Sequence, residues 1–320
     1  MNPVVPVVTF GEAMLRLTVP GHGRLQEVDA FRVDVAGAEL NVAAALASLG
    51  VPTSWISAVP DSPVGRRVEA AASDAGVDIS SVIRVPGGRL GIFYVEYGVA
   101  PRPISVWYDR RDSAFAEVEA FDLAPLAGAG YGLISGITPG LGERSATATR
   151  AFVDAAKAAG VEVCIDVNYR ERLWTTEEAR RSLGVLLGES DVVVCSTRDA
   201  RRVFGCDGSD EEVLLQLHRT WCPQARAVAL TVGPAGALGW AEGVSQRQPA
   251  LPTEMVDRFG SGDAFTAGLL WGLMNGDLAH ALRAGTALAA LKCSVSGDQA
   301  RFSTRELEAV MNDPGEQITR

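Results

Sequence analysis

The feature of this sequence that most restricts its fold is an alternation between short apolar runs and longer segments with helical periodicity. The apolar runs are 4–10, 55–59, 132–135, 161–167, 191–195 and 227–232, and the helical segments are 42–49, 64–75, 144–159, 177–187, 199–204, 213–221 and 264–274. Strands that are apolar along their whole length are typical of parallel sheets buried on both faces. The alternation therefore predicts a doubly wound, mostly parallel α/β sheet with helices on both faces.

Two further segments, 90–96 and 104–108, differ from this pattern. They are aromatic, alternate between apolar and polar residues, and are joined by a turn-like stretch, so they predict a β-hairpin. A hairpin inserted into a strand–helix alternation cannot pair inside the parallel sheet. Together with a loosely alternating segment at 25–35, we expect it to form a small β lid, built from about 12–36 and 88–118, on a single domain of residues 1–320. Exposed strand edges seek partners, so the lid predicts a homodimer or a higher homo-oligomer.

The composition argues against several kinds of partner. The 320 residues carry a net charge of −10, and nucleic acid would require a basic surface. No apolar run reaches the roughly 20 residues of a membrane span, and we see no secretory signal at the N-terminus. Five scattered cysteines without a C-x-x-C pair indicate free thiols, so we expect a cytoplasmic protein with neither membrane nor nucleic-acid partners.

The stretch 257–265, Asp-Arg-Phe-Gly-Ser-Gly-Asp-Ala-Phe, stands where a loop becomes a helix. The first N–H groups of a helix lack intrahelical partners and carry the positive end of its dipole, so Gly260, Ser261 and Gly262 would form an anion hole for phosphate. Asp263 would be an ionised acceptor for the proton of an attacking hydroxyl. The same stretch could instead merely cap a helix, with Asp263 in its first turn.

This stretch resembles the D-T-x-G-A-G-D-x-F signature of the ribokinase-like (pfkB) family of carbohydrate kinases. Its two aspartates, two of its glycines and its final phenylalanine match, whereas Arg258 replaces the threonine and Ser261 the middle alanine. The resemblance implies a ribokinase-like fold and a phosphotransferase that uses ATP and Mg²⁺ to phosphorylate an alcohol group. It also implies that the catalytic residues are Gly260, Ser261, Gly262 and Asp263.

Two further motifs concern the substrate. Gly37 and Asn41 match the G-G-x-x-x-N motif of the family, with Ala36 in place of the first glycine, and Asp-x-Asn-x-Arg at 166–170, followed by Leu-Trp, resembles the 2-keto-3-deoxygluconate kinases of the family. An arginine suits a sugar acid because a guanidinium can bind a carboxylate through two hydrogen bonds. The resemblance implies that 2-keto-3-deoxygluconate is phosphorylated to its 6-phosphate. The implied substrate contacts are Gly37, Asn41, Tyr97, Tyr108, Arg110, Arg170, Asp263 and Asp298.

The stretch 231–237, Thr-Val-Gly-Pro-Ala-Gly-Ala, resembles the nucleotide loop of the family, in which glycines let the backbone approach a ligand closely. It is neither a Walker A loop nor the G-x-G-x-x-G of nicotinamide enzymes. Ser196 and Asp199 occupy the N-x-x-E position of the family, which implies that Asp199 acts on Mg²⁺ through water. The residues implied to bind the nucleotide are Asn168, Arg170, Ser196, Thr231, Gly233, Gly236, Gly260, Ser261 and Gly262.

Two other functions are compatible with these motifs. A kinase of this family could act on a neutral sugar such as fructose or ribose, or on a nucleoside, although Arg170 argues against an uncharged substrate. The substitutions at 36, 196 and 258 would also fit a catalytically silent sugar-acid sensor, and the intact Asp263 argues against that function. The sequence therefore favours a sugar-acid kinase.

Overall fold

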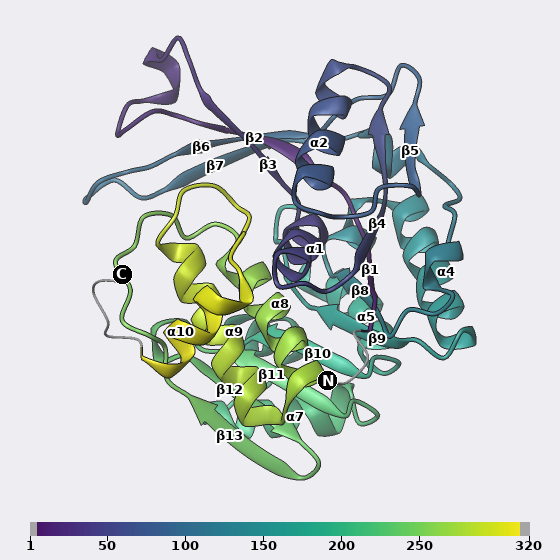
Figure 1. Cartoon of the computed structure of the whole chain (residues 1–320), viewed down its shortest axis with the longest axis vertical. Coiled ribbons are helices and arrows are strands. Elements are labelled where there is room, and N and C mark those ends of the chain that lie inside the picture. Colours follow the sequence, from purple (N-terminus) through teal and green to yellow (C-terminus); the bar gives the residue numbers. More distant parts are fainter. Residues whose placement is uncertain (1–4, 314–320) are drawn as a thin grey trace.

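Residues 5–313, the part of the chain that the computed structural model describes, fold around a nine-stranded sheet (Figure 1). In spatial order the strands are β13 (Val244–Gln248), β12 (Ala237–Ala241), β11 (Ala227–Thr231), β10 (Val192–Ser196), β9 (Glu162–Asp166), β8 (Tyr131–Ser135), β1 (Val7–Phe10), β4 (Thr53–Pro60) and β5 (Val82–Val85). From β11 to β5 all neighbours are parallel, which confirms the sequence prediction. The antiparallel edge formed by β12 and β13 was not expected. Residue 4 of the expected first strand lies outside the described residues.

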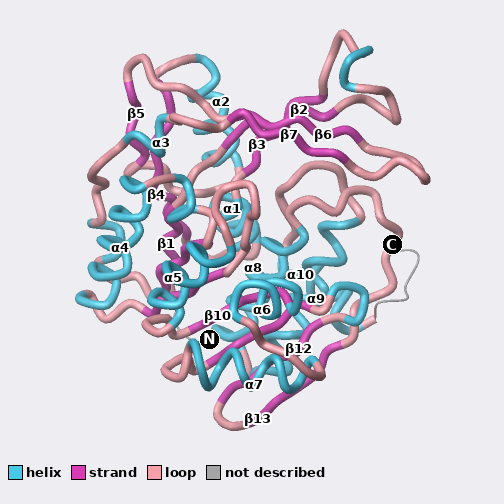
Figure 2. Tube along the Cα trace, turned by 180° about the vertical axis from the view of Figure 1, so that it is seen from behind, coloured by secondary structure: helices cyan, strands magenta, loops and turns pink. Residues whose placement is uncertain are grey.

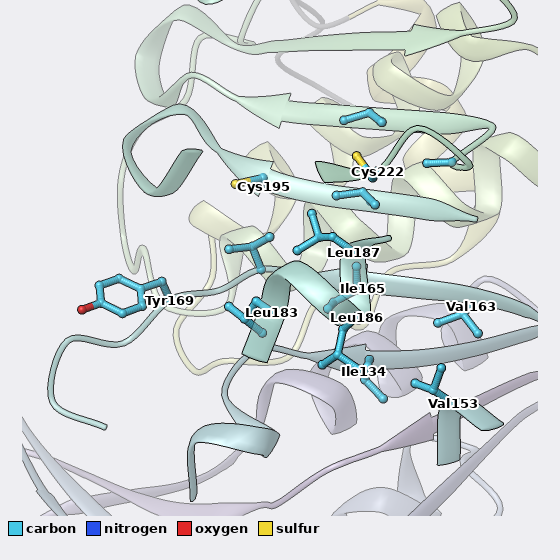
Figure 3. Close-up of a cluster of buried hydrophobic side chains, with 14 of the residues drawn as sticks. Ile134, Val153, Val163, Ile165, Tyr169, Leu183, Leu186, Leu187, Cys195 and Cys222 are labelled. Atoms are coloured by element: carbon cyan, nitrogen blue, oxygen red, sulfur yellow. The ribbon is translucent and has the colours of Figure 1, made fainter. Parts of the chain in front are cut away.

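Helices cover both faces of this sheet. One face packs against α3 (Ala114–Glu117), α4 (Glu143–Ala158), α5 (Thr176–Leu187), α6 (Thr197–Phe204) and α7 (Asp210–Trp221), and the other against α1 (Ala38–Ser48), α2 (Pro63–Asp74), α8 (Ser261–Asn275), α9 (Leu278–Cys293) and α10 (Thr304–Asn312). Strand side chains alternate between the two cores. On β9, for example, Val163 and Ile165 lie in the core that α5 covers (Figure 3), whereas Cys164 between them belongs to the opposite core. Within residues 5–313 no helix combines the length and the apolar composition needed to cross a bilayer.

The starts of the helices differ in how their first N–H groups are satisfied. Capping boxes, each worth roughly 1 kcal/mol, begin α5, α7 and α10. By contrast, α1 and α8 begin after Gly37 and Gly260 with no side-chain cap. The N–H groups at these two starts are therefore available to other partners, and both starts lie in motifs that the sequence singles out.

A second, four-stranded sheet, the lid, projects from one end of the main body (Figures 1 and 2). Its strands, in spatial order, are β3 (Arg32–Ala36), β2 (Met14–Thr18), β6 (Ile92–Glu96) and β7 (Ser105–Asp109). β6 and β7 form an antiparallel hairpin, as the alternating aromatic pattern predicts. The strand expected at 25–35 is shorter, because Leu25–Glu27 forms a 3₁₀ turn and β3 begins only at Arg32.

Candidate active site

The expected anion hole lies at the start of α8. Gly260 precedes the helix with φ +78, and a Cβ there would lie 1.9 Å from the carbonyl oxygen of Asp298, so this position requires glycine. The Ser261 N–H donates weakly to the Arg258 carbonyl oxygen at 3.3 Å. A Cβ at Gly262 would meet nothing within 4 Å. The helix start therefore faces open space with its positive dipole end, as an anion site requires.

Asp263 lies in the first turn of α8 and is 8% exposed. The Asn41 side chain donates a hydrogen bond of 2.7 Å to the Asp263 carboxylate, so the two glycine motifs of the sequence meet in space. Burial raises the pKa of the Asp263 carboxyl to about 6, and the hydrogen bond from Asn41 opposes the rise. At neutral pH the group is then mostly ionised and close to the ideal pKa of a general base.

Asp263 lines a small cavity of about 80 Å³. The residues that line this cavity include most of those that the sequence implicates in substrate binding. They are Gly37, Asn41, Tyr108, Arg110, Arg170, Asp263 and Asp298. Tyr108, Arg110 and Arg170 also line a wider cavity of about 810 Å³ beside it, which gives an entry from the lid side.

The two arginines expected to face a substrate carboxylate differ in their partners. The Arg110 guanidinium donates to Glu12, through Nε at 2.9 Å and through a second, shorter bond, so its charge is already compensated. Arg170 is exposed and forms no ion pair within residues 5–313. It still lies close enough to Asp263 for its charge to oppose the burial that raises the pKa of that carboxyl. Arg170 is thus the cation of this cavity that remains available to an anion.

Two other expected substrate contacts, Tyr97 and Asp298, belong to a buried hydrogen-bond network. The Tyr97 hydroxyl donates to Asp257 at 2.5 Å and accepts from Arg16 at 2.7 Å, and it does not line the small cavity. Asp298 does line it, but one of its oxygens accepts a 2.7 Å bond from Arg16. Burial raises the pKa of Asp298 to about 6, and the charge of Arg16 opposes the rise.

Three charged residues of this site were not among the expected substrate or nucleotide contacts: Glu12, Arg16 and Glu39. Glu39 is 1% exposed, and its Oε1 accepts bonds of 2.6 Å from the hydroxyls of Ser135 and Thr138. A Cβ at Gly11 would lie 2.2 Å from the Glu39 side chain. For Arg16 the sequence did contain a signal, because a charged residue stands there inside a run that is otherwise nearly apolar.

Apart from the three residues at the start of α8, the residues implied to bind the nucleotide lie at or just after the ends of β9, β10 and β11. Thr231 ends β11 and is followed by Gly233 and Gly236, both with positive φ. The Ser196 side chain caps α6 by accepting the Asp199 N–H at 3.0 Å, so the serine has a structural task that the sequence did not indicate. Asp199 is buried and pairs with Arg198 at 3.2 Å.

The neighbouring strand end carries Asn168, which has φ +38, and Asp166. The Thr266 hydroxyl of α8 donates to Asp166 at 3.3 Å. Burial, followed by the charge of Asp263, raises the pKa of Asp166 to about 8, so this carboxyl is mostly protonated at neutral pH. Asp263 is then the more ionised carboxyl of the two.

Comparison with known proteins agrees with this geometry. The model described as pfkB family carbohydrate kinase matches residues 6–305. The 2-dehydro-3-deoxygalactonokinase of Haloferax volcanii is 38% identical over 310 residues, 95% of this chain and 96% of that protein. The 2-dehydro-3-deoxygluconokinase of Bacillus subtilis is 28% identical over 306 residues, 93% of each. The crystal structure of 2-dehydro-3-deoxygluconokinase from Thermotoga maritima superposes with a TM-score of 0.89 at 32% identity, and the match covers 96% of this chain and 98% of that one.

Proposed function

Because the chain belongs to the pfkB family of carbohydrate kinases, we propose that it phosphorylates 2-keto-3-deoxygluconate, also called 2-dehydro-3-deoxygluconate, at its terminal hydroxyl. As a member of this family the chain is a phosphotransferase with an alcohol group as acceptor. The single observation that carries the choice of a sugar acid is Arg170, which lines the same cavity as Asp263 and forms no ion pair with any residue from 5 to 313. The relatives named for 2-dehydro-3-deoxy sugar acids support the same substrate class.

The charges of the small cavity support an anionic substrate. Each of two carboxylates that line it has a cationic partner, since Glu12 pairs with Arg110 and Asp298 with Arg16. Glu39 is held by neutral donors. Once these groups are matched, no carboxylate within residues 5–313 is bonded to the Arg170 guanidinium. A substrate carboxylate can pair with that guanidinium by charge-assisted hydrogen bonds, which an uncharged sugar does not offer.

In the proposed reaction Asp263 takes the proton of the terminal hydroxyl as its oxygen attacks the γ-phosphorus of ATP. The bond from that phosphorus to the β,γ-bridging oxygen breaks, and ADP leaves. The N–H groups at the start of α8 and the helix dipole stabilise the charge that develops on the transferred phosphoryl group. Asn41 holds the Asp263 carboxylate in place. The chain thus supplies orientation, charge stabilisation and one proton acceptor, which is what phosphoryl transfer requires.

The decisive experiment is a steady-state comparison of acceptors with wild type and Arg170→Ala. We expect 2-keto-3-deoxygluconate to be turned over far better than fructose, ribose or adenosine. Losing one charge-assisted bond costs ~1.5–3 kcal/mol, so Arg170→Ala should raise KM for the acid roughly 10–150-fold and leave KM for ATP nearly unchanged. The galactonate epimer belongs in the same panel because a 38% identical relative is named for it.

Arg181→Ala is the matched control for this variant. Arg181 lies on α5, is 75% exposed in its side chain and pairs at the surface with Glu177, away from both cavities. Its removal should change neither KM. If fructose or ribose matched the acid in wild type, or if Arg170→Ala weakened only ATP, the sugar-acid substrate would have to be abandoned.

Mg²⁺ is the second part of the proposal. The nucleotide loop offers backbone and glycines but no lysine, so the charge of the triphosphate has to be neutralised mainly by a metal ion. Asp199 would act on that ion through water, since hard cations that keep several waters need few protein ligands. We expect turnover to stop when EDTA is present in excess and to return with added Mg²⁺. Turnover that survived full chelation would refute the metal requirement.

We also propose that two copies associate through the lid in the cytoplasm. The lid sheet ends in open edges at β3 and β7, and its hairpin exposes the apolar side chains of Ile104 and Trp107 at 38% and 41%. The five cysteines are buried and free, which suits a reducing compartment. Sedimentation should give twice the monomer mass of 33.7 kDa. In Trp107→Asp the measured mass should shift toward that of the monomer.

A further inference from the structure

Arg16 is a charged residue with no solvent exposure, on the lid strand β2. Its guanidinium uses both ends of its planar fork. Nη1 donates to Asp298 at 2.7 Å, Nη2 reaches Asp257 at 2.9 Å and the Tyr97 hydroxyl at 2.7 Å, and Nε donates to Thr18 at 2.9 Å. These bonds satisfy the donors on three sides of a group that always carries its charge.

The partners of Arg16 come from three separate parts of the chain. Tyr97 follows β6 of the lid, Asp257 opens the loop that leads into the anion hole, and Asp298 lies beyond α9. Asp257 binds the other two parts together, because its carboxylate also accepts the N–H of Phe259 at 3.0 Å and that of Gly297 at 3.0 Å. A movement of Arg16 would therefore change contacts in the lid, in the catalytic loop and in the cavity wall at the same time.

The Phe259 ring lies under the guanidinium, with its centroid 4.6 Å from the Arg16 Cζ. Phe259 stands immediately before Gly260, the cap of α8, and it lines the small cavity. The arginine thus contacts the catalytic loop by stacking as well as by charge. The stacking orients the ring that forms one wall of the cavity.

We propose that Arg16 is a positioning residue for the acceptor: it holds the Asp298 carboxylate in the cavity wall, compensates its charge and ties the lid to the catalytic loop. The inference rests on the proposed function, because it assumes that a sugar acid occupies this cavity. An uncompensated Asp298 would repel the carboxylate of such a substrate. Paired with Arg16, it can accept a substrate hydroxyl through its second oxygen without that repulsion.

A purely structural role does not account for this cluster. Buried ion pairs are often no more stabilising than apolar residues of the same volume, since both charges must be desolvated. Arg16 holds two buried carboxylates rather than one, and one of them lines the substrate cavity. Its place in an otherwise apolar strand therefore points to a requirement of the ligand site.

The test is a double-mutant cycle of Arg16→Met and Asp298→Asn, read as KM for each substrate. We expect Arg16→Met to raise KM for the sugar acid by ~10-fold or more, as for the loss of one charge-assisted bond, with KM for ATP changed less than ~3-fold. In that background Asp298→Asn should add little, because Arg16 acts through Asp298. Arg16→Lys, which keeps the charge, should recover part of the loss.

Arg226→Met is the matched control. Arg226 likewise donates to a tyrosine hydroxyl, that of Tyr131 at 2.5 Å, and to a carboxylate, that of Glu162 at 2.7 Å, but at the amino ends of β8 and β9. Both KM values should stay within ~2-fold of wild type, whatever stability is lost. If Arg16→Met fails to fold, Tyr97→Phe removes two bonds of the same network, those to Arg16 and Asp257, and should raise KM for the acid alone.

Three results would overturn the proposal: equal rises in both KM values, additive effects of Arg16→Met and Asp298→Asn, or an unchanged KM for the acid in Arg16→Met and Tyr97→Phe. Turnover of the acid by wild type is measured first, and its absence would refute the proposed function rather than the role of Arg16. In that case KM for whichever acceptor the wild type uses, measured in the same variants, decides the role of Arg16.

Discussion

The two glycine loops of the candidate site, 231–236 and 257–262, differ in what holds them. The loop at 257–262 is fixed by side chains, because Asp257 accepts four hydrogen bonds or ion-pair contacts and Gly260 packs against the Asp298 carbonyl. The loop at 231–236 is held by the backbone, with the Val232 N–H donating to the Gly236 carbonyl at 2.8 Å. Gly233 and the two residues after it are exposed.

This difference matches what each loop is proposed to do. A loop that stabilises a transition state has to keep its N–H groups in place while charge develops, which favours a rigid, cross-linked support. A loop that only surrounds a nucleotide can adapt to the ligand. The structure therefore leads us to expect severe effects of changes at Gly260 and Asp263 and mild effects of changes at the exposed Gly233, whereas Gly236 packs against the backbone of residues 248–250 and would not tolerate a side chain.

The largest effect should come from Asp263→Asn, which keeps the shape of the catalytic loop but removes the proton acceptor. We expect kcat to fall by ~10²–10⁴ with nucleotide binding roughly kept. Steady-state kinetics and a nucleotide titration measure the two quantities separately. Asp277→Asn is the control, because Asp277 caps α9 and asparagine caps a helix equally well.

The pH dependence of the wild type gives a second measurement of the same group. Burial raises the pKa of Asp263 to about 6, and only the ionised form can accept a proton. Turnover should therefore be complete above that pH and decrease as the pH falls through about 6. Near-normal turnover in Asp263→Asn, or a profile that stays flat down to pH ~4.5, the region of an unperturbed carboxyl, would remove Asp263 from the mechanism.

Gly260→Ala should have the next largest effect. The residue has φ +78, and an added Cβ would lie 1.9 Å from the Asp298 carbonyl oxygen, which is backbone and has little freedom to move. A left-handed conformation alone costs about 1–3 kcal/mol in a non-glycine residue, and the clash adds to it. We expect a larger loss in the free energy of unfolding than 1–3 kcal/mol, measured by denaturant titration, together with a loss of kcat.

The sequence predicts those parts of the molecule that depend on local pattern. The parallel strands other than β5, and the lid hairpin, follow from apolar runs and aromatic alternation, and the start of α8 follows from Gly260 and the helical segment behind it. By contrast, β5, β12, β13, α9 and α10 were not predicted. Val244–Gln248 alternates only weakly and is largely exposed, so its pairing depends on the neighbouring strand rather than on its own composition.

The charged partners of the site could not be predicted, because they depend on contacts between distant parts of the chain. Arg16 and Asp298 are 282 residues apart, and Asn41 and Asp263 are 222 apart. The sequence identified Arg110 as a cation of the site, but its pairing with Glu12 becomes visible only once the lid is placed. Ser196 was expected to contact the nucleotide, but its side chain caps α6. A serine before a helix is compatible with either role, so the sequence could not distinguish them.

Gly233→Ala should have the smallest effect and serves as the matched control for Gly260→Ala. Gly233 also has positive φ, +55, but an added Cβ would meet nothing within 4 Å. Both variants therefore carry the cost of a left-handed alanine, about 1–3 kcal/mol, and only Gly260→Ala adds a clash with the backbone. We expect Gly233→Ala to lower the free energy of unfolding by that amount alone, to change KM for ATP a few-fold at most and to leave kcat unchanged. Denaturant titration of the two variants side by side isolates the packing contribution, and equal losses of stability and of kcat would show that the two loops are held equally, against the comparison drawn from the structure.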